Sequence, residues 1–220
     1  MQPTLRRAYR RESEETRRAD LIAATQALVS EGGPEAATVR AIAARAGVTA
    51  GLIRHYFQSK DELTRAAYLS LMDGMTAQGA DALEGVGALP EERLAAFVAA
   101  SLCPPVVDIG AVVLWAAYVN KVRTDDALLA AHETAYLAYR NTLQGLIAAL
   151  PRDASEAQLR GEAIACNALI DGLWLEGSLL PHAFAPDEVV TIGLRSVGAI
   201  LGVDLLAHST MLLYPGKILP

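Results

Sequence analysis

The sequence predicts an all-α protein. Apolar side chains recur at spacings of three and four along most of the chain, which is the period of a helix, and strand-like alternation does not stand out. Hydrophobic residues make up 52% of the chain and aromatic residues only 5%, and this alanine-rich composition suits close-packed helices. Glycine and proline clusters separate the periodic segments and indicate where helices end.

The first predicted helix begins at about Ser13 and ends at Gly32-Gly33-Pro34. Its apolar side chains with helical spacing are Leu21, Ile22, Thr25, Leu28 and Val29. The chain before this helix is highly charged and includes a basic arm, Arg6–Arg11. Two interpretations of the arm stay open: it enters a DNA minor groove beside the main contact, or it is an unstructured, solvated tail.

Two short helices joined by a tight turn are predicted next. Thr38 is a suitable N-cap for a helix that ends at Gly47, and Thr49 caps a second helix that ends at about Tyr56. Ala43 is small enough for the helices to cross closely, and Gly47 tolerates a positive φ in the turn. The inward-facing positions are Ile42, Ala46, Val48, Ile53 and Tyr56. Because the second helix has barely two turns, the pattern favours a DNA-binding helix-turn-helix over a plain helical hairpin in a bundle.

Ser59 caps a further helix that runs from Lys60 to about Leu83, with Asp61 and Glu62 in its first turn, where the helix dipole favours acidic groups. Later helices are expected at about 90–102, 106–122, 125–150, 153–180 and 186–202. These elements predict an arm and helix-turn-helix domain over 1–65, a helical body over 66–202 and a tail over 203–220. The tail is either disordered or packs on a partner subunit.

Charge is distributed unevenly along the chain. The net charge is -6, but residues 1–65 contain 11 Lys and Arg against 8 Asp and Glu, whereas the remaining residues contain 8 against 17. Phosphate neutralisation is local, so a basic head on an acidic body is compatible with binding of double-stranded DNA.

The helix-turn-helix segment resembles the TetR family of bacterial regulators over about residues 13–70. The resemblance is carried by GVTAG at 47–51 and YFQSKDEL at 56–63. It implies a three-helix DNA-binding head, a body of about six helices that binds a ligand and dimerises through its last two helices, and repression of transcription. The family commonly has Tyr at the position of Arg54 and His at that of Tyr56. The HYF sequence at 55–57 resembles the choline-responsive branch, which represses glycine-betaine synthesis.

The candidate DNA contacts fall into three groups. A hydroxyl and a guanidinium at the first short helix suit phosphate, small residues that lead the second let its backbone approach base edges, and longer side chains read bases or hold the DNA backbone. The groups are Thr38 and Arg40; Thr49, Ala50 and Gly51; and Arg54, His55, Tyr56 and Lys60. The resemblance implies a phosphate contact for Lys60, and Arg54 suits either phosphate or guanine. An ordinary solvated surface remains the alternative for Arg40, His55 and Lys60.

Aromatic residues and carboxylates of the body form a candidate ligand site. They are Trp115 and Tyr118; His132, Tyr136 and Tyr139; and Trp174 with Asp171 and Glu176. Aromatic faces with carboxylates suit a quaternary ammonium such as choline, through cation–π contacts. Ordinary core packing is the competing interpretation.

A homodimer is expected because a helix-turn-helix head binds a palindromic operator with two-fold symmetry. The apolar residues that favour an interface on the last two helices are Ile164, Leu169, Leu173, Val189, Ile192, Leu194 and Val197. An intramolecular core is the alternative for some of them.

Several other classes of function are not favoured. The sequence has no phosphate-binding glycine loop, nucleophile elbow or zinc spacing among its four histidines, so no enzyme activity, metal or cofactor is expected. The apolar stretch from Ile109 to Val119 is too short to span a bilayer, and no secretory signal is expected.

Cys103 and Cys166 suit buried free thiols in a cytoplasmic protein, with a disulfide or redox switch as the alternative. An effector-independent role in chromosome organisation is the competing function.

Overall fold

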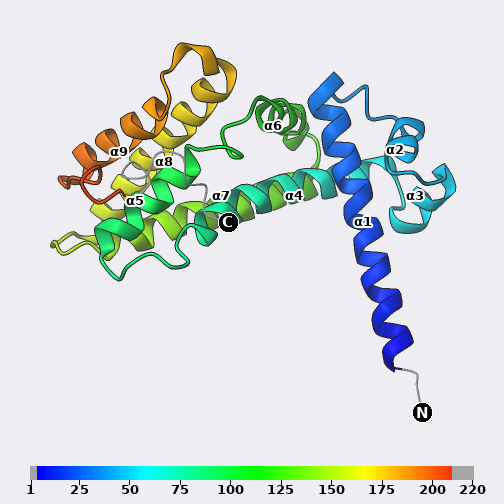
Figure 1. The fold of residues 1–220 in the computed structure, drawn as a ribbon, viewed down its shortest axis with the longest axis horizontal. Helices are drawn as coiled ribbons and strands as arrows, with labels where there is room; N and C mark the ends of the chain where they lie inside the picture. The colour runs from blue at the N-terminus through cyan, green and yellow to red at the C-terminus, as the bar shows by residue number, and fades with distance from the viewer. Residues whose placement is uncertain (1–3, 210–220) are drawn as a thin grey trace. The chain divides into compact units, whose positions relative to one another are not determined.

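The computed structural model describes the backbone of residues 4–209 and the side chains of residues 14–209, and the regular elements of this range are all helical (Figure 1). The α-helices are α1 Thr4–Gly32, α2 Val39–Arg45, α3 Ala50–Tyr56, α4 Lys60–Asp81, α5 Pro90–Ser101, α6 Ile109–Val122, α7 Asp126–Ala148, α8 Glu156–Leu179 and α9 Glu188–Leu201, with a short 3-10 helix η1 at Pro181–Ala183. The all-α prediction is confirmed. The ends of α4 to α9 lie within three residues of the predicted ones.

The start of α1 was predicted wrongly. The helix begins at Thr4 rather than at about Ser13, so the backbone of the basic arm is helical and the unstructured alternative is wrong. Arginine and glutamate have high helix propensity, and no glycine or proline interrupts the chain between Thr4 and Ser13. The side chains of Arg6–Arg11 lie outside the described residues, as does the predicted tail beyond residue 209.

The described chain divides into two compact units. The head unit contains the residues up to 71 together with 113–129, and the body unit contains 72–112 together with the residues from 130 onward. Helices α4, α6 and α7 therefore each contribute to both units. None of the described helices is long and apolar enough to cross a membrane.

The head unit has a core that ties α1 to α2, α3 and α4. Gln26 on α1 donates a hydrogen bond from Nε2 to the carbonyl of Ala67 on α4, at 2.8 Å. The rings of Tyr68 and Tyr118 meet edge to face with centroids 5.4 Å apart. The large apolar side chains of this core are Leu21, Val29, Ile42, Ile53, Phe57, Leu63, Tyr68 and Tyr118. Such a core fixes the orientation of the short helices α2 and α3, which are too short to be stable alone.

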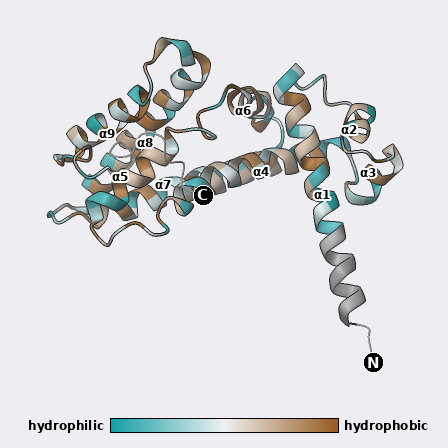
Figure 2. Ribbon diagram, in the orientation of Figure 1, coloured by the Kyte–Doolittle hydropathy of each residue, from teal (hydrophilic) through white to brown (hydrophobic). Residues whose placement is uncertain are grey.

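The body unit packs α5, α8 and α9 closely, and hydrophobic residues are distributed along these helices (Figure 2). Gly193 permits the close approach of α9 to α5, because a Cβ atom there would lie 2.2 Å from Leu102 Cδ1. Leu194 and Val197 are fully buried in this core. Their assignment to a dimer interface is therefore wrong, whereas Ile164 on α8 is 40% exposed.

Candidate DNA-binding and ligand-binding sites

The turn between α2 and α3 is a Schellman motif. The N–H of Val48 donates to the carbonyl of Ala43 at 2.9 Å, and the N–H of Gly47 donates to that of Ala44 at 3.3 Å. Gly47 has a φ of +65°, as the sequence predicts, and a Cβ there would meet nothing within 4 Å. Glycine is favoured at this position by its backbone conformation and not by lack of space.

The two short helices begin differently. Thr38 Oγ1 accepts a hydrogen bond from the N–H of Ala41 at 3.1 Å, so Thr38 caps α2 as predicted. Thr49 has the extended backbone of an N-cap, but its side chain makes no capping hydrogen bond, so that part of the prediction is wrong. Because α3 does not use this hydroxyl, it remains available for a contact outside the protein.

The inward face of the helix-turn-helix agrees in part with the prediction. Ile42, Ala43 and Ile53 are buried, whereas Ala46, Val48 and Tyr56 are only half-buried. Phe57 is 1% exposed and belongs to the core, although the sequence analysis did not select it. Its position directly after α3, in an apolar pair with Tyr56, was the signal available in the sequence.

Arg18 on α1 is a further residue that the sequence analysis missed. Its guanidinium carbon lies 4.4 Å from the centroid of the Phe57 ring, and its Nη1 donates to the carbonyl of Tyr56 at 3.2 Å. These contacts attach the C-terminal end of α3 to α1. Arg18 and Phe57 are far apart in the sequence and meet only in the folded structure. The sequence alone therefore does not indicate this cation–π contact.

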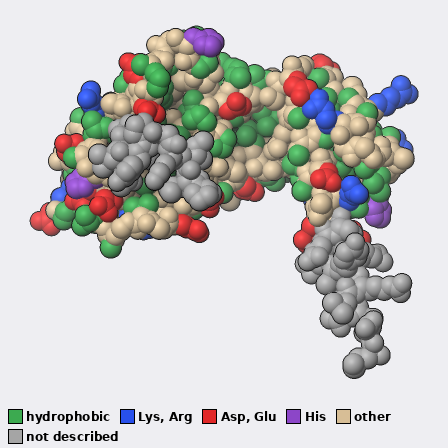
Figure 3. All heavy atoms as spheres, viewed as in Figure 1, with side chains coloured by type: hydrophobic (Ala, Val, Ile, Leu, Met, Phe, Trp, Pro, Cys, Tyr) green, Lys and Arg blue, Asp and Glu red, His purple; other side chains and the backbone are tan. Residues whose placement is uncertain are grey.

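The predicted DNA contacts share one surface property: nearly all of them are exposed. Among the described residues, Arg40, Arg54 and Lys60 have no hydrogen-bond or ion-pair partner for their side chains. The space-filling view shows basic side chains on the part that contains α2 and α3 (Figure 3). The exposed members are Thr38, Arg40, Thr49, Ala50, Gly51, Arg54, His55 and Lys60, and Tyr56 is half-buried with its ring 5.1 Å from that of His55.

Lys60 is the first residue of α4, and the start of this helix is well capped. Ser59 Oγ accepts from the N–H of Glu62 at 3.1 Å, and Glu62 Oε2 accepts from the N–H of Gln58 at 2.7 Å. Two side chains thus fix the chain on either side of Lys60. This capping holds the base of the Lys60 side chain in place while its ammonium stays in solvent.

The body unit brings three of the predicted ligand residues together. Tyr136 Oη donates to Asp171 Oδ2 at 2.6 Å, and the His132 ring stacks on that of Tyr136 with centroids 5.7 Å apart. Asn167 Nδ2, which the sequence analysis missed, donates to Asp171 at 2.9 Å and to Tyr136 Oη at 2.6 Å. The group of His132, Tyr136, Asn167 and Asp171 is called the Asp171 cluster below.

Burial dominates the electrostatics of the Asp171 cluster. It raises the pKa of Asp171 above its ordinary value, although hydrogen bonds from Tyr136 and Asn167 act in the opposite direction. Burial, with the neighbouring carboxylate, raises the pKa of Tyr136 to about 12. Asn167 Oδ1 is buried and has no hydrogen-bond partner among the described residues. The cluster therefore contains a carboxylate that a bound cation would stabilise and an acceptor that a donor would satisfy.

The other predicted ligand residues have separate roles in the fold. Tyr139 donates to Ser101 Oγ at 2.8 Å and lies against Phe97, with ring centroids 5.0 Å apart. Trp174 Nε1 donates to the carbonyl of Val106 at 2.8 Å. Trp115 and Tyr118 belong to the head unit, where Trp115 is half-buried and Tyr118 is buried, while Glu176 of the body unit is exposed. No group of three or more His, Cys, Asp or Glu among the described residues is arranged to hold a metal ion.

Comparisons with known proteins agree with this geometry. Residues 21–67 match the model of the tetR family of bacterial regulatory proteins, and residues 90–202 match that of the C-terminal domain of BetI-type transcriptional repressors. The chain is 32% identical over 171 residues to the HTH-type transcriptional regulator BetI of Burkholderia thailandensis, covering 77% of this chain and 86% of that one. It is 34% identical over 168 residues to BetI of Escherichia coli, covering 74% and 83%.

Solved structures are also similar. A protein of Pseudomonas aeruginosa PAO1 described as a transcriptional regulator matches with a TM-score of 0.75 and 32% identity, over 88% of this chain and 94% of that one. A regulator of Saccharomonospora viridis, solved in complex with choline, matches with a TM-score of 0.66 over 84% and 97% of the two chains. At 18% identity the second match supports the fold alone.

Proposed function

Because the chain belongs to the TetR family of DNA-binding transcriptional regulators and has a BetI-type C-terminal domain, we propose that it is a homodimeric repressor, released from a palindromic operator by a small organic cation of the choline class. Members of this family are regulators and not enzymes. The observation that carries the proposal is the surface of α2, α3 and the start of α4, where the candidate DNA contacts are exposed.

The chemistry of α3 suits the major groove. Its first residues are small, which lets the backbone approach base edges, and Arg54 and His55 extend from its exposed side. Arg40 and Lys60 supply positive charge on either side of α3 in the sequence, where phosphates would lie. This division assigns sequence recognition to α3 and most of the affinity to the flanking cations.

The dimer interface is proposed on α8 and α9. Leucine and isoleucine side chains on this pair remain between 38% and 55% exposed in the single chain, including Leu180 directly after α8. Exposed large apolar side chains gathered on neighbouring helices are typical of a subunit interface. The residues are Ile164, Leu175, Leu179, Leu180 and Ile200.

The effector site is proposed at the Asp171 cluster. A quaternary ammonium cannot donate ordinary hydrogen bonds, so it is bound by aromatic faces and by a carboxylate. Tyr136 and His132 offer the faces, and Asp171 offers the charge. The hydroxyl of choline would donate to the orphan acceptor Asn167 Oδ1. The Saccharomonospora viridis regulator, which has a similar fold, was solved in complex with choline. Tyr139, Trp174 and Glu176 of the body unit stay predicted contacts.

Ligand and DNA binding would oppose each other through one conformational equilibrium. A ligand shifts an equilibrium only by its difference in affinity for the two states. The effector would favour the body conformation in which the two heads do not match the half-sites, and operator DNA would in turn weaken effector binding by the same factor.

Selection of the preferred DNA site from random duplexes tests the DNA half of the proposal. A palindrome with one fixed spacing is expected, and gel retardation on it should depend steeply on salt. If Arg54 reads guanine, Arg54→Ala should relax the base preference. If Arg54 holds phosphate, the substitution should weaken binding to all sequences equally. Selection of unrelated or non-palindromic sequences would favour the alternative, an effector-independent role in chromosome organisation.

Titration of choline into the repressor–operator complex tests the effector half. Choline at millimolar concentration should release the wild-type protein from the operator. At a choline concentration that just releases the wild type, Asp171→Asn should stay bound to the operator, because its affinity for choline is about tenfold lower while its affinity for the operator is unchanged. Asp153→Asn, which alters an exposed carboxylate outside the cluster, should respond as the wild type does. If neither choline nor betaine aldehyde releases the wild type, the choline class of effector is wrong.

A further inference from the structure

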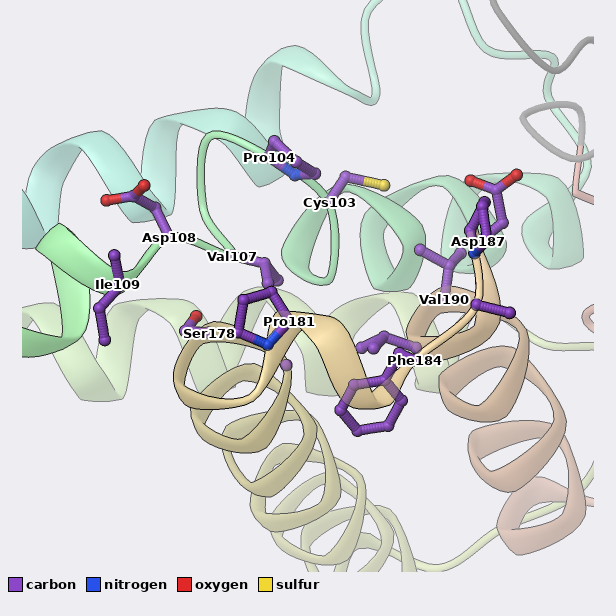
Figure 4. A pocket seen from close by; sticks show the side chains of 14 residues that line it. Cys103, Pro104, Val107, Asp108, Ile109, Ser178, Pro181, Phe184, Asp187 and Val190 are labelled. Atoms are coloured by element: carbon purple, nitrogen blue, oxygen red, sulfur yellow. The ribbon is translucent and has the colours of Figure 1, made fainter.

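A pocket of about 490 Å³ lies in the body unit, away from the residues of the Asp171 cluster (Figure 4). Its walls come from the loop between α5 and α6, the C-terminal end of α8, η1 with the segment after it, and the start of α9. Its volume is in the range of pockets that bind small molecules. The apolar part of the lining includes Val107, Ile109, Pro181, Phe184 and Val190.

One buried polar group in the wall of the pocket lacks a partner. Ser178 is 2% exposed, and its Oγ has no hydrogen-bond partner among the described residues. An unsatisfied buried hydroxyl destabilises the protein, since it has given up its hydrogen bonds to water without gaining others. A ligand with an oxygen acceptor at this wall would supply the missing hydrogen bond.

The charged side chains that line the pocket are both acidic. Asp108 and Asp187 are both exposed, and Figure 4 places them at opposite ends with Val107 and Pro181 between them. The lining contains no lysine, arginine or histidine. Asp108 uses Oδ1 to cap α6, where it accepts from the N–H of Ala111 at 3.1 Å, and Asp187 has no side-chain capping bond. Two carboxylates above apolar walls attract cations and repel anions such as fatty acids.

We propose that this pocket is a second ligand site, which binds an organic cation with an apolar body larger than choline. The apolar walls bind the body of the ligand, the carboxylates of Asp108 and Asp187 attract its ammonium from the two ends of the pocket, and Ser178 donates to an ester or ether oxygen where the ligand has one. The site is separate from the proposed effector site and does not depend on it.

Cysteine footprinting locates the ligand without any substitution. Cys103 lines the pocket and is half-buried, whereas Cys166 is buried elsewhere in the body unit and serves as the internal control. Hexyltrimethylammonium should slow alkylation of Cys103 by N-ethylmaleimide, measured by mass spectrometry, and leave Cys166 unchanged. Hexanoate, which has the same chain length and a negative charge, should not protect Cys103. Equal protection by both compounds would contradict a cation site.

Charge-removing variants test the role of the carboxylates. Asp187 has a left-handed backbone with a φ of 61°, which asparagine tolerates well, so Asp187→Asn preserves the conformation. The double variant Asp108→Asn, Asp187→Asn should raise the dissociation constant of hexyltrimethylammonium about tenfold in calorimetry. Asp81→Asn, an exposed carboxylate of α4 outside the lining, should leave it unchanged. An unchanged constant in the double variant would overturn the proposal.

Two further measurements separate this site from its alternatives. Ser178→Ala should weaken binding of hexanoylcholine, which has an ester acceptor, and should not weaken binding of hexyltrimethylammonium. If the substitution weakens binding of both ligands or of neither, the assigned role of Ser178 is wrong. Asp171→Asn should leave the protection of Cys103 intact even where the choline response is lost. If Cys103 becomes protected without ligand as the protein dimerises, a second copy covers the pocket and the ligand site is wrong.

Discussion

The head unit and the body unit present their candidate functional residues in opposite ways. In the head, Arg40, Arg54 and Lys60 project into solvent and have no partner among the described residues. In the body, the half-buried side chains of Tyr136 and Asp171 are hydrogen-bonded to each other and to the buried Asn167. DNA is a large polyanion that separate exposed cations can bind almost independently, whereas a small cation requires a group of side chains held together. Substitutions in the head should therefore act additively, and those in the body cooperatively.

The largest expected effect tests the additive behaviour of the head. Arg40→Ala and Lys60→Ala each remove a positive charge without removing an internal contact, so the free energy of unfolding should stay unchanged. Together they should weaken binding to all DNA sequences about 100-fold. The slope of binding against salt concentration should decrease by about one unit for each phosphate that is no longer neutralised.

The matched control for this pair is Arg45→Ala on α2. Arg45 is also an exposed arginine, but it forms an ion pair with Glu31 and lies outside the predicted contacts. It should change DNA affinity much less, and loss of its solvent-exposed ion pair should change stability little. If all three variants weaken DNA binding equally, the head binds DNA through its overall charge and not through contacts of particular residues.

A smaller effect, about tenfold on choline affinity, is expected for Asp171→Asn in the body. The substitution also has a pH signature. Burial raises the pKa of Asp171 in the folded state, so the folded protein retains the proton longer than the unfolded chain. Stability should therefore fall as the pH rises from about 4, the ordinary range of aspartate, through the raised pKa of the folded state. Urea unfolding across this range should give a flatter profile of stability against pH for the variant, and identical profiles would contradict a raised pKa of Asp171 in the folded protein.

The same contrast explains what could be predicted from the sequence. The two helices and the turn of the helix-turn-helix were predictable, because Thr38, Ala43 and Gly47 meet local geometric requirements within one short segment. The Thr49 cap and the core position of Phe57 were not. The helices of the body followed from periodicity and from their proline and glycine boundaries. The start of α1 was not predictable in this way, since its charged first turns have no apolar face to mark them.

The partners of the body residues could not be predicted. Tyr136 and Asp171 were both selected, but Asn167 and Ser101, which bond to the aromatic residues, were not. Their roles depend on which faces of α5, α7 and α8 meet, and the sequence specifies that only through long-range packing. For the same reason Leu194 was assigned to an interface when it belongs to the core. A hydrophobic face indicates that a helix packs against another element, but it does not indicate which element that is.

Arg18→Ala tests whether the exposed head has an internal support of its own. The change removes the contact with the Phe57 ring and the hydrogen bond to the Tyr56 carbonyl, and it should lower the free energy of unfolding by about 1 kcal/mol. Arg17→Ala, which removes only an exposed ion pair with Asp20, should cost less than about 0.5 kcal/mol. Equal losses in urea unfolding would mean that Arg18 does not hold the end of α3.

The smallest expected effect separates stability from DNA binding at Gly51. This residue lies in α3, and a Cβ there would meet only Thr49 Oγ1, at 3.9 Å, so the fold itself does not require glycine. Gly51→Ala should raise the free energy of unfolding by about 0.5–1 kcal/mol, because alanine favours the helix, and still weaken operator binding several-fold, because the added methyl group lies where the backbone approaches the bases. Gly145→Ala on α7, where a Cβ would also meet nothing within 4 Å, should stabilise the protein by a similar amount and leave operator binding unchanged. If Gly51→Ala raises stability but weakens operator binding, while Gly145→Ala only raises stability, then glycine is kept at position 51 for close contact with DNA at a cost in stability. A variant that is more stable and binds the operator as well as the wild type would remove Gly51 from the DNA contact.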